Sequence, residues 1–444
     1  MSSTIIRQAS IVNEGCVRTG DLLIADGLIE SILPPGSDTH ADNEVDATGM
    51  LLMPGVIDEH VHFREPGMTA KADTATESRA AAAGGVTSYM EMPNTRPATT
   101  TLEALDDKFA NAAAKSLVNY SYYFGATSHN SRLFARLDRR TVCGIKLFMG
   151  SSTGDMLVDD RDALRAIFEG TDMVIAAHCE DSGLIDRKAA EVKAEYGDAE
   201  VPVRLHSVIR GEEACYRSTA TAVEMADKAR ARLHVMHIST ARELTLFDAG
   251  RPDGKRITAE VCLPHLLFTD DDYDTLGARI KCNPSIKTAS DRHALRAALS
   301  TGRLDTIATD HAPHLLADKQ GGALRAASGM PMLQFSLIAM LDLAVGGTID
   351  VTRVAELMCH APARLYHIDR RGFIRPGYHA DIVLVANRQW TLDASGIASR
   401  CGWSPLEGHT FNHRVMQTYV NGRLVYDNGR FDDTVRGERL LFDY

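Results

Sequence analysis

Two histidines stand two residues apart in the segment DEHVHF, as His60 and His62. The surrounding segment VIDEHVH predicts a β-strand, and residues i and i+2 of a strand project from the same face. Two neighbouring neutral imidazoles are suitable ligands for a divalent metal ion. Because the same spacing also occurs on solvated strands, the pair taken alone leaves a structural role equally open.

Four further residues that can bind metal or carry protons stand at or near the ends of other predicted strands. They are Lys146, His178, His237 and Asp310. The strand ends of a parallel barrel meet at one rim, so side chains that are far apart in the sequence converge there. A single histidine near a strand end is more often structural than a ligand, but six candidates at one rim favour a metal centre.

Lys146 differs from the other candidates because an ammonium group would repel a metal cation. Its neighbours Ile145, Leu147 and Phe148 are apolar, and burial among them favours the neutral amine by lowering its pKa. A neutral lysine can react with carbon dioxide to give a carbamate, an anion whose two oxygens can bridge two metal ions. An ion pair between Lys146 and an acid across the barrel is the alternative.

The middle of the chain predicts the elements that position these residues, because apolar segments alternate there with helical stretches. Eight segments predict strands, at residues 56–62, 86–92, 120–126, 143–149, 173–179, 233–238, 257–262 and 305–310. Strands that alternate with helices indicate an α/β fold, a (β/α)8 TIM barrel whose functional groups lie at the carboxyl ends of the strands.

Both ends of the chain have a different residue pattern from the middle. Short segments of aliphatic and β-branched residues, separated by turns, occupy residues 5–46 and return from residue 372 onward. This pattern predicts strands. We therefore expect a small β-sandwich domain formed by both termini, with its parts at residues 1–53 and 372–444 and the barrel at residues 54–371.

The composition excludes several classes of partner. The 444 residues carry a formal net charge of -11, so nucleic acid and anionic membranes are not expected partners, and a small anionic substrate would need local positive charge. The N-terminus lacks a continuous apolar segment, and no stretch of eighteen apolar residues occurs, so we expect a cytoplasmic protein. The eight cysteines form no C-x-x-C pair, which is typical of reduced thiols.

As a set, the motifs resemble those of the amidohydrolase superfamily and, within it, the dihydroorotases. The resemblance covers about residues 44–386 and rests on DEHVHFREPG, MEMPNT, GIKLFM, AAHCED, MHIST, ATDHAPH and the C-terminal G-x-I-x-x-G-x-x-A-D-I-V. It implies two zinc ions per subunit, bridged by carboxylated Lys146. The remaining ligands that it implies are His60, His62 and Asp310 for one ion, and His178 and His237 for the other.

The resemblance also implies an activity, the reversible cyclisation of N-carbamoyl-L-aspartate to L-dihydroorotate in pyrimidine biosynthesis. A metal-activated hydroxide would attack the ring carbonyl, and Asp310 would carry its proton to the ring nitrogen. Arg64, Asn94, Asn283 and His314 are the expected substrate-binding residues, and a guanidinium group matches a planar carboxylate. A homodimer is expected on the same likeness.

Departures from the family pattern keep alternatives open. The segment Asn283–Lys287 has the sequence N-P-S-I-K where dihydroorotases commonly show N-P-P-L-R, and Asp155 could bridge the metals in place of a modified lysine. Allantoinases and dihydropyrimidinases, or hydantoinases, are similar in the metal residues but usually differ at Arg64 and at the MPNT string. A non-catalytic protein of the same fold is a third alternative.

Overall fold

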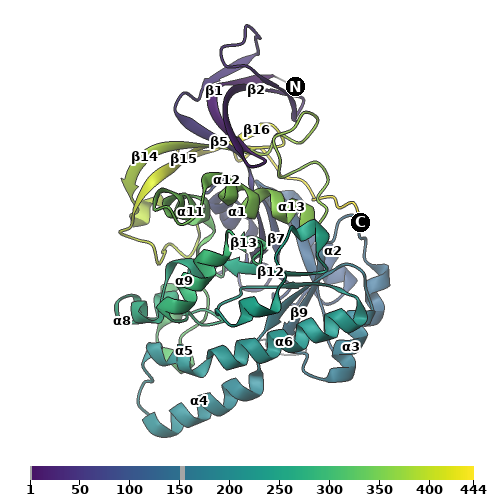
Figure 1. The fold of residues 1–444 in the computed structure, drawn as a ribbon, viewed down its shortest axis with the longest axis vertical. Coiled ribbons are helices and arrows are strands. Elements are labelled where there is room, and N and C mark those ends of the chain that lie inside the picture. The colour runs from purple at the N-terminus through teal and green to yellow at the C-terminus, as the bar shows by residue number, and fades with distance from the viewer. Residues whose placement is uncertain (1–2, 151–155) are drawn as a thin grey trace.

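The computed structural model describes residues 3–150 and 156–444, and its centre is a barrel of eight parallel strands (Figure 1). The strands pair in the order β13-β12-β11-β10-β9-β8-β7-β6. Their bounds are β6 (Val56–Val61), β7 (Val86–Glu91), β8 (Asn119–Gly125), β9 (Gly144–Met149), β10 (Val174–Cys179), β11 (Arg232–Val235), β12 (Ile257–Cys262) and β13 (Thr306–Ala308). Each strand overlaps one of the eight predicted segments, so the predicted (β/α)8 fold is confirmed.

The barrel closes between its first and last strands through the residues that follow them. Val61 forms a parallel bridge with His311, and the backbone N–H of His62 donates to the carbonyl of His311 at 2.8 Å. This contact brings the end of β6 beside the end of β13. It therefore places His62 next to Asp310, although 247 residues separate them in the sequence.

Helices surround the barrel, and several begin at side chains that cap them. Asp73 and Thr76 form a capping box at the start of α1, and Thr288 and Asp291 form another at the start of α9. The helices are α1 (Thr74–Ala83), α2 (Leu102–Lys115), α3 (Arg161–Glu169), α4 (Ser182–Tyr196), α5 (His206–Ile209), α6 (Glu212–Ala229), α7 (Leu263–Leu267), α8 (Tyr273–Leu276), α9 (Ala289–Ala298), α10 (Gly322–Arg325), α11 (Ser336–Val345), α12 (Val351–Ala355) and α13 (Ala361–Leu365).

Strands from both ends of the chain, where the sequence predicted a β-sandwich, pair with each other in a second sheet separate from the barrel (Figure 1). Strand β5 pairs antiparallel with β14, with Met53 opposite Val383. Apolar side chains from both halves, including Leu22 of β2 and Ile382 of β14, pack into one buried cluster. The strands are β1 (Thr4–Asn13), β2 (Cys16–Ala25), β3 (Leu28–Leu33), β4 (Asn43–Asp46), β5 (Met50–Pro54), β14 (Ile382–Thr391), β15 (Thr410–Val420), β16 (Arg423–Asp427) and β17 (Arg430–Phe431).

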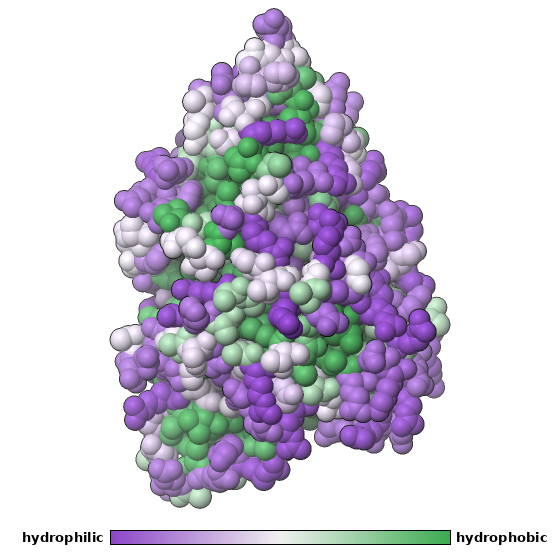
Figure 2. All heavy atoms as spheres, viewed as in Figure 1, coloured by the Kyte–Doolittle hydropathy of each residue, from purple (hydrophilic) through white to green (hydrophobic). Residues whose placement is uncertain are grey.

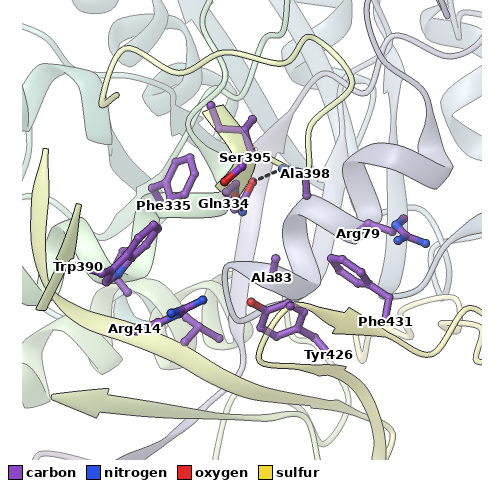
Figure 3. Close-up of a pocket in the computed structure, with 15 residues that line it drawn as sticks. Arg79, Ala83, Gln334, Phe335, Trp390, Ser395, Ala398, Arg414, Tyr426 and Phe431 are labelled. Carbon is purple, nitrogen blue, oxygen red and sulfur yellow. Dashed lines mark hydrogen bonds between the residues drawn. The ribbon is translucent and has the colours of Figure 1, made fainter. Parts of the chain in front are cut away.

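A cavity of about 420 Å³ lies where this sheet meets α1 and α11 (Figure 3). Its wall carries the aromatic rings of Phe335, Trp390, Tyr426 and Phe431. The loop that lines it is held by Gln334, whose Oε1 accepts a hydrogen bond from the Ala398 N–H at 2.8 Å. None of the residues predicted to carry chemistry is among the described residues that line this cavity, so the candidate site lies elsewhere.

The outer surface is largely polar on the face seen in Figure 2, where hydrophilic side chains predominate. Apolar side chains gather at the end of the molecule that α4 occupies in Figure 1. Among the described residues, no helix combines the length and the apolar character needed to cross a membrane.

Candidate active site

The predicted site residues converge on a cavity of about 110 Å³ at the carboxyl ends of the barrel strands. Nine of the ten line it directly: His60, His62, Arg64, Asn94, Lys146, His178, His237, Asn283 and Asp310. The tenth, His314, lies beside Arg64, with its Nε2 atom 3.1 Å from Nη2 of the guanidinium group. The barrel therefore brings together all ten residues that the sequence singled out.

The first group of candidate ligands comes from the strands that close the barrel. The Oδ1 atom of Asp310 lies 3.2 Å from Nε2 of His60 and 3.0 Å from Nε2 of His62. One ligand atom from each residue lies within 4.8 Å of the others. Burial lowers the pKa of His62 to about 4, so its ring is neutral near pH 7. Two imidazole nitrogens and a carboxylate oxygen are a typical donor set for zinc.

The second group lies across the cavity on β10 and just beyond β11. Nδ1 of His178 is 2.8 Å from Nε2 of His237, and both rings are buried. Burial lowers the pKa of His178, and burial together with the neighbouring His178, His60 and Lys146 holds the pKa of His237 well below its usual value. Both rings are therefore neutral near pH 7, and one nitrogen of each faces the other.

Lys146 also lines the cavity, on β9, and its side chain is only 1% exposed. Burial lowers its pKa to about 8, although Glu260 and Asp310 act in the opposite direction. Its Nζ atom lies 2.7 Å from Sδ of Met236, and within the described chain no carboxylate oxygen comes within 4.0 Å of it. An ion pair, the alternative role for Lys146, is therefore not formed by the described residues.

These donors fit a metal centre by their chemistry. Two sets of imidazoles face the same cavity, Asp310 adds a carboxylate, and Lys146 is a buried amine whose lowered pKa favours the neutral form that carbon dioxide modifies. Asp155, the alternative bridging residue, lies outside the described residues.

Two buried glutamates that sequence reasoning missed orient the histidines. Oε1 of Glu260 lies 2.8 Å from Nδ1 of His60 and accepts a hydrogen bond from the backbone N–H of His237 at 2.9 Å. Oε2 of Glu180 lies 2.9 Å from Nε2 of His178. Such carboxylate contacts fix the tautomer and orientation of metal-ligating histidines. The i+2 spacing of Glu180 after His178 was the one sequence signal that could have indicated this role.

The cavity also contains a buried cation. Arg64 is 7% exposed, and burial lowers its pKa to about 10, so the guanidinium group stays charged near pH 7. Its Nε donates to the carbonyl of Pro313 at 3.0 Å. Oδ1 of Asn94 lies 2.8 Å from Nδ1 of His62, and Oδ1 of Asn283 lies 3.1 Å from Nε2 of His206.

Two further lysines, Lys71 and Lys287, have different surroundings. Sequence reasoning did not single out Lys71. Its Nζ atom lies 2.9 Å from Nδ1 of His314. Lys287, in the segment that departs from the family pattern, donates through Nζ to the carbonyl and the hydroxyl of Ser285 at 3.0 and 2.9 Å. It is not among the described residues that line the cavity.

The chain belongs to the amidohydrolase family, whose model matches residues 51–425. Among relatives, it is 36% identical over 422 residues to a dihydroorotase of Halobacterium salinarum, covering 92% of this chain and 96% of that one. It is 32% identical over 432 residues to an allantoinase of Bacillus velezensis, covering 96% and 94%. Among solved structures, the L-hydantoinase (dihydropyrimidinase) of Arthrobacter aurescens matches with a TM-score of 0.90 and 27% identity, over 97% and 98% of the two chains.

The family inferred from the motifs is thus confirmed. Relatives named for different substrates resemble this chain at comparable identity, so overall similarity does not distinguish dihydroorotase from allantoinase. The choice of substrate depends on the residues around the cavity.

Proposed function

We propose that this protein is a dihydroorotase, a two-zinc enzyme that interconverts N-carbamoyl-L-aspartate and L-dihydroorotate in pyrimidine biosynthesis. The observation that supports this most is the buried guanidinium group of Arg64, which lines the same cavity as the candidate metal ligands. Dihydroorotate carries a carboxylate on the ring, whereas the substrates of allantoinases and dihydropyrimidinases do not present it. An anionic substrate would give the buried cation a partner of matching geometry.

The metal ligands would be His60, His62 and Asp310 for one zinc ion and His178 and His237 for the other, with carboxylated Lys146 between them. When bound, zinc would polarise the ring carbonyl and make hydroxide available near neutral pH, which accounts for a hydrolase without a serine or cysteine nucleophile.

Asp310 is suited to carry the proton. Burial raises its pKa, but the neighbouring His60, the hydrogen bond with His62 and the charge of Lys146 outweigh this effect and hold it well below the usual value. The side chain is therefore a carboxylate near pH 7 and can accept a proton from the attacking water. It would return this proton to the ring nitrogen as the amide bond breaks, and the reverse transfer would close the ring.

Arg64 and His314 would hold the ring carboxylate, and Asn94 and Asn283 would complete the substrate contacts. The Oδ1 atom of Asn94 already faces His62, and that of Asn283 faces His206. Their amide N–H groups are the donors that each asparagine has left for a substrate.

Turnover by the purified, zinc-loaded protein tests the proposal. We expect the highest kcat/KM for dihydroorotate, cyclisation of N-carbamoyl-L-aspartate by the same protein, and two zinc ions per chain. A higher kcat/KM for allantoin or dihydrouracil would assign the chain to another cyclic amidase, the alternative that the allantoinase relatives favour. No turnover with two metals bound would indicate a non-catalytic protein. Light scattering would test the further proposal that the chain forms a homodimer.

A further inference from the structure

Lys71 is a cation beside the candidate site that the proposed chemistry does not use. It lies in the loop between β6 and α1, with its side chain 27% exposed. Its Nζ atom is 2.9 Å from Nδ1 of His314 and 3.1 Å from Oδ2 of Asp318. The ion pair with Asp318 holds the ammonium group against one edge of the His314 ring.

His314 is in contact with a cation on each of its two ring nitrogens. Nη2 of Arg64 lies 3.1 Å from Nε2, and Nζ of Lys71 lies 2.9 Å from Nδ1. Guanidinium and ammonium groups only donate hydrogen bonds, and a neutral imidazole has one acceptor nitrogen. Burial, Arg64 and Lys71 lower the pKa of His314 to about 2, although the backbone of Ser328 acts in the opposite direction, so the ring is neutral. One of the two contacts is therefore a hydrogen bond. In the other, an N–H group of the cation faces the N–H group of the ring.

The geometry indicates which contact is the hydrogen bond. The Lys71 contact is the shorter of the two, and its ammonium group is fixed by Asp318. The acceptor is then Nδ1, and the proton of the ring sits on Nε2, the atom next to Arg64. Two N–H groups at that edge repel each other, and an anion that accepts from both relieves this repulsion.

We propose that Lys71 is a positioning residue that holds His314 in its Nε2–H tautomer, so that His314 and Arg64 present two adjacent donors to an anionic group on the substrate. This role rests on the proposed function, in which these two side chains hold the ring carboxylate. It adds a determinant of substrate class, because a ring without the carboxylate offers no anionic acceptor for the pair of donors.

The same geometry gives the consequence of losing Lys71. Oδ2 of Asp318 lies 3.8 Å from Nδ1 of His314. Without the ammonium group between them, the carboxylate is free to accept a hydrogen bond from Nδ1–H, which favours the Nδ1–H tautomer of the ring. The lone pair of Nε2 then faces the substrate carboxylate. Binding of an anionic ring is weakened, while binding of a neutral ring is not.

Kinetics with two substrates test this role. For Lys71→Met we expect KM for dihydroorotate to rise about tenfold or more with kcat within about twofold, as for a lost charged hydrogen bond. With dihydrouracil, the same ring without the carboxylate, kcat/KM should stay unchanged, and zinc content should stay at the wild-type value. Lys71→Arg should restore most of the affinity. An equal loss on both substrates, or no loss on either, would overturn the assignment.

Lys115→Met is the matched control. Lys115 forms an ion pair with Glu65 of the same loop, and no hydrogen bond or ion pair joins it to His314 within the described structure. This variant loses a lysine and an ion pair near the site but keeps the His314 contact. Wild-type kinetics are expected for it, and a selective loss on dihydroorotate here would contradict the role of Lys71.

The tautomer itself can be measured without turnover. Long-range proton–nitrogen NMR spectra of ¹⁵N-histidine-labelled protein distinguish the two tautomers, and the His314 signals are assigned by their loss in His314→Gln. We expect Nε2–H in the wild type and in Lys115→Met, and Nδ1–H in Lys71→Met. An unchanged tautomer in Lys71→Met overturns the assignment even if dihydroorotate is turned over. A tautomer switch in a protein inactive on dihydroorotate would instead refute the proposed function and leave the role of Lys71 standing.

Discussion

Replacing Arg64 with methionine tests most directly the proposal that this residue holds the substrate carboxylate. The Arg64 side chain is 7% exposed, and its Nε atom is already used by the carbonyl of Pro313. Methionine keeps a similar unbranched apolar stem and removes only the donors and the charge. Arg64 has a φ of 68°, and because both residues carry a Cβ the replacement leaves this backbone strain unchanged.

The size of the expected loss follows from the atoms that remain free for substrate. The hydrogen bond from Nε is present with or without substrate, so it contributes nothing to the difference in free energy between free and substrate-bound enzyme. The outer guanidinium nitrogens then supply one or two charged hydrogen bonds to the substrate, each worth about 1.5–3 kcal/mol. The energies of two such bonds from one group do not simply add. We expect a loss of about 2–4 kcal/mol in transition-state stabilisation, or about 30- to 900-fold in kcat/KM. Arg64→Lys keeps the charge without the planar fork and should fall between the wild type and methionine.

The assay is steady-state hydrolysis of dihydroorotate by both variants, with zinc measured by mass spectrometry and folding by thermal melting. Zinc content and melting temperature should match the wild type. An unaltered kcat/KM in Arg64→Met would refute the proposal that Arg64 holds the substrate carboxylate. A loss accompanied by loss of zinc would place the effect in the metal centre instead.

Three further perturbations test the metal centre. Lys146→Ala should empty at least one metal position and abolish turnover, with partial rescue by short carboxylic acids, because the modified amine would join the two ligand sets; full activity would contradict the bridge. Glu260→Gln should weaken zinc binding about 10- to 100-fold, because His60 and His237 lose a charged contact; an unchanged zinc titration would show that Glu260 does not tune the ligands. Removal of metal with a chelator should lower both activity and melting temperature, and added zinc should restore them; a chelated protein with full activity would exclude a metal mechanism.

The barrel could be predicted from the sequence because its strands are buried on both faces. The segments Ile145–Met149 and Val174–Cys179 are continuous runs of buried residues, and such runs give a strong pattern. The site could be predicted because the carboxyl ends of all barrel strands lie at one rim, so histidines near those ends lie close together. His178 illustrates this, since it stands on a strand in an otherwise apolar stretch.

The supporting residues could not be predicted, for two physical reasons. Glu260 lies on β12 and Lys71 in a loop, and neither has a spacing that separates a buried polar contact from a solvated side chain. In addition, His237 and Asp310 lie beyond the ends of β11 and β13 with φ values of 43° and 47°. A hydrophobic pattern reports burial and carries no information on such a left-handed backbone, which determines where these side chains point.

The pairing of β5 with β14 has a consequence for the synthesis of this protein. The two strands lie more than 300 residues apart, so β5 waits for its partner β14 until most of the chain has been made. During that interval β5 presents an unpaired backbone edge, which attracts other extended chains. A nascent chain of this kind is a natural client for chaperones, and its yield on expression should respond to their supply more than that of a protein whose neighbouring strands are close in sequence.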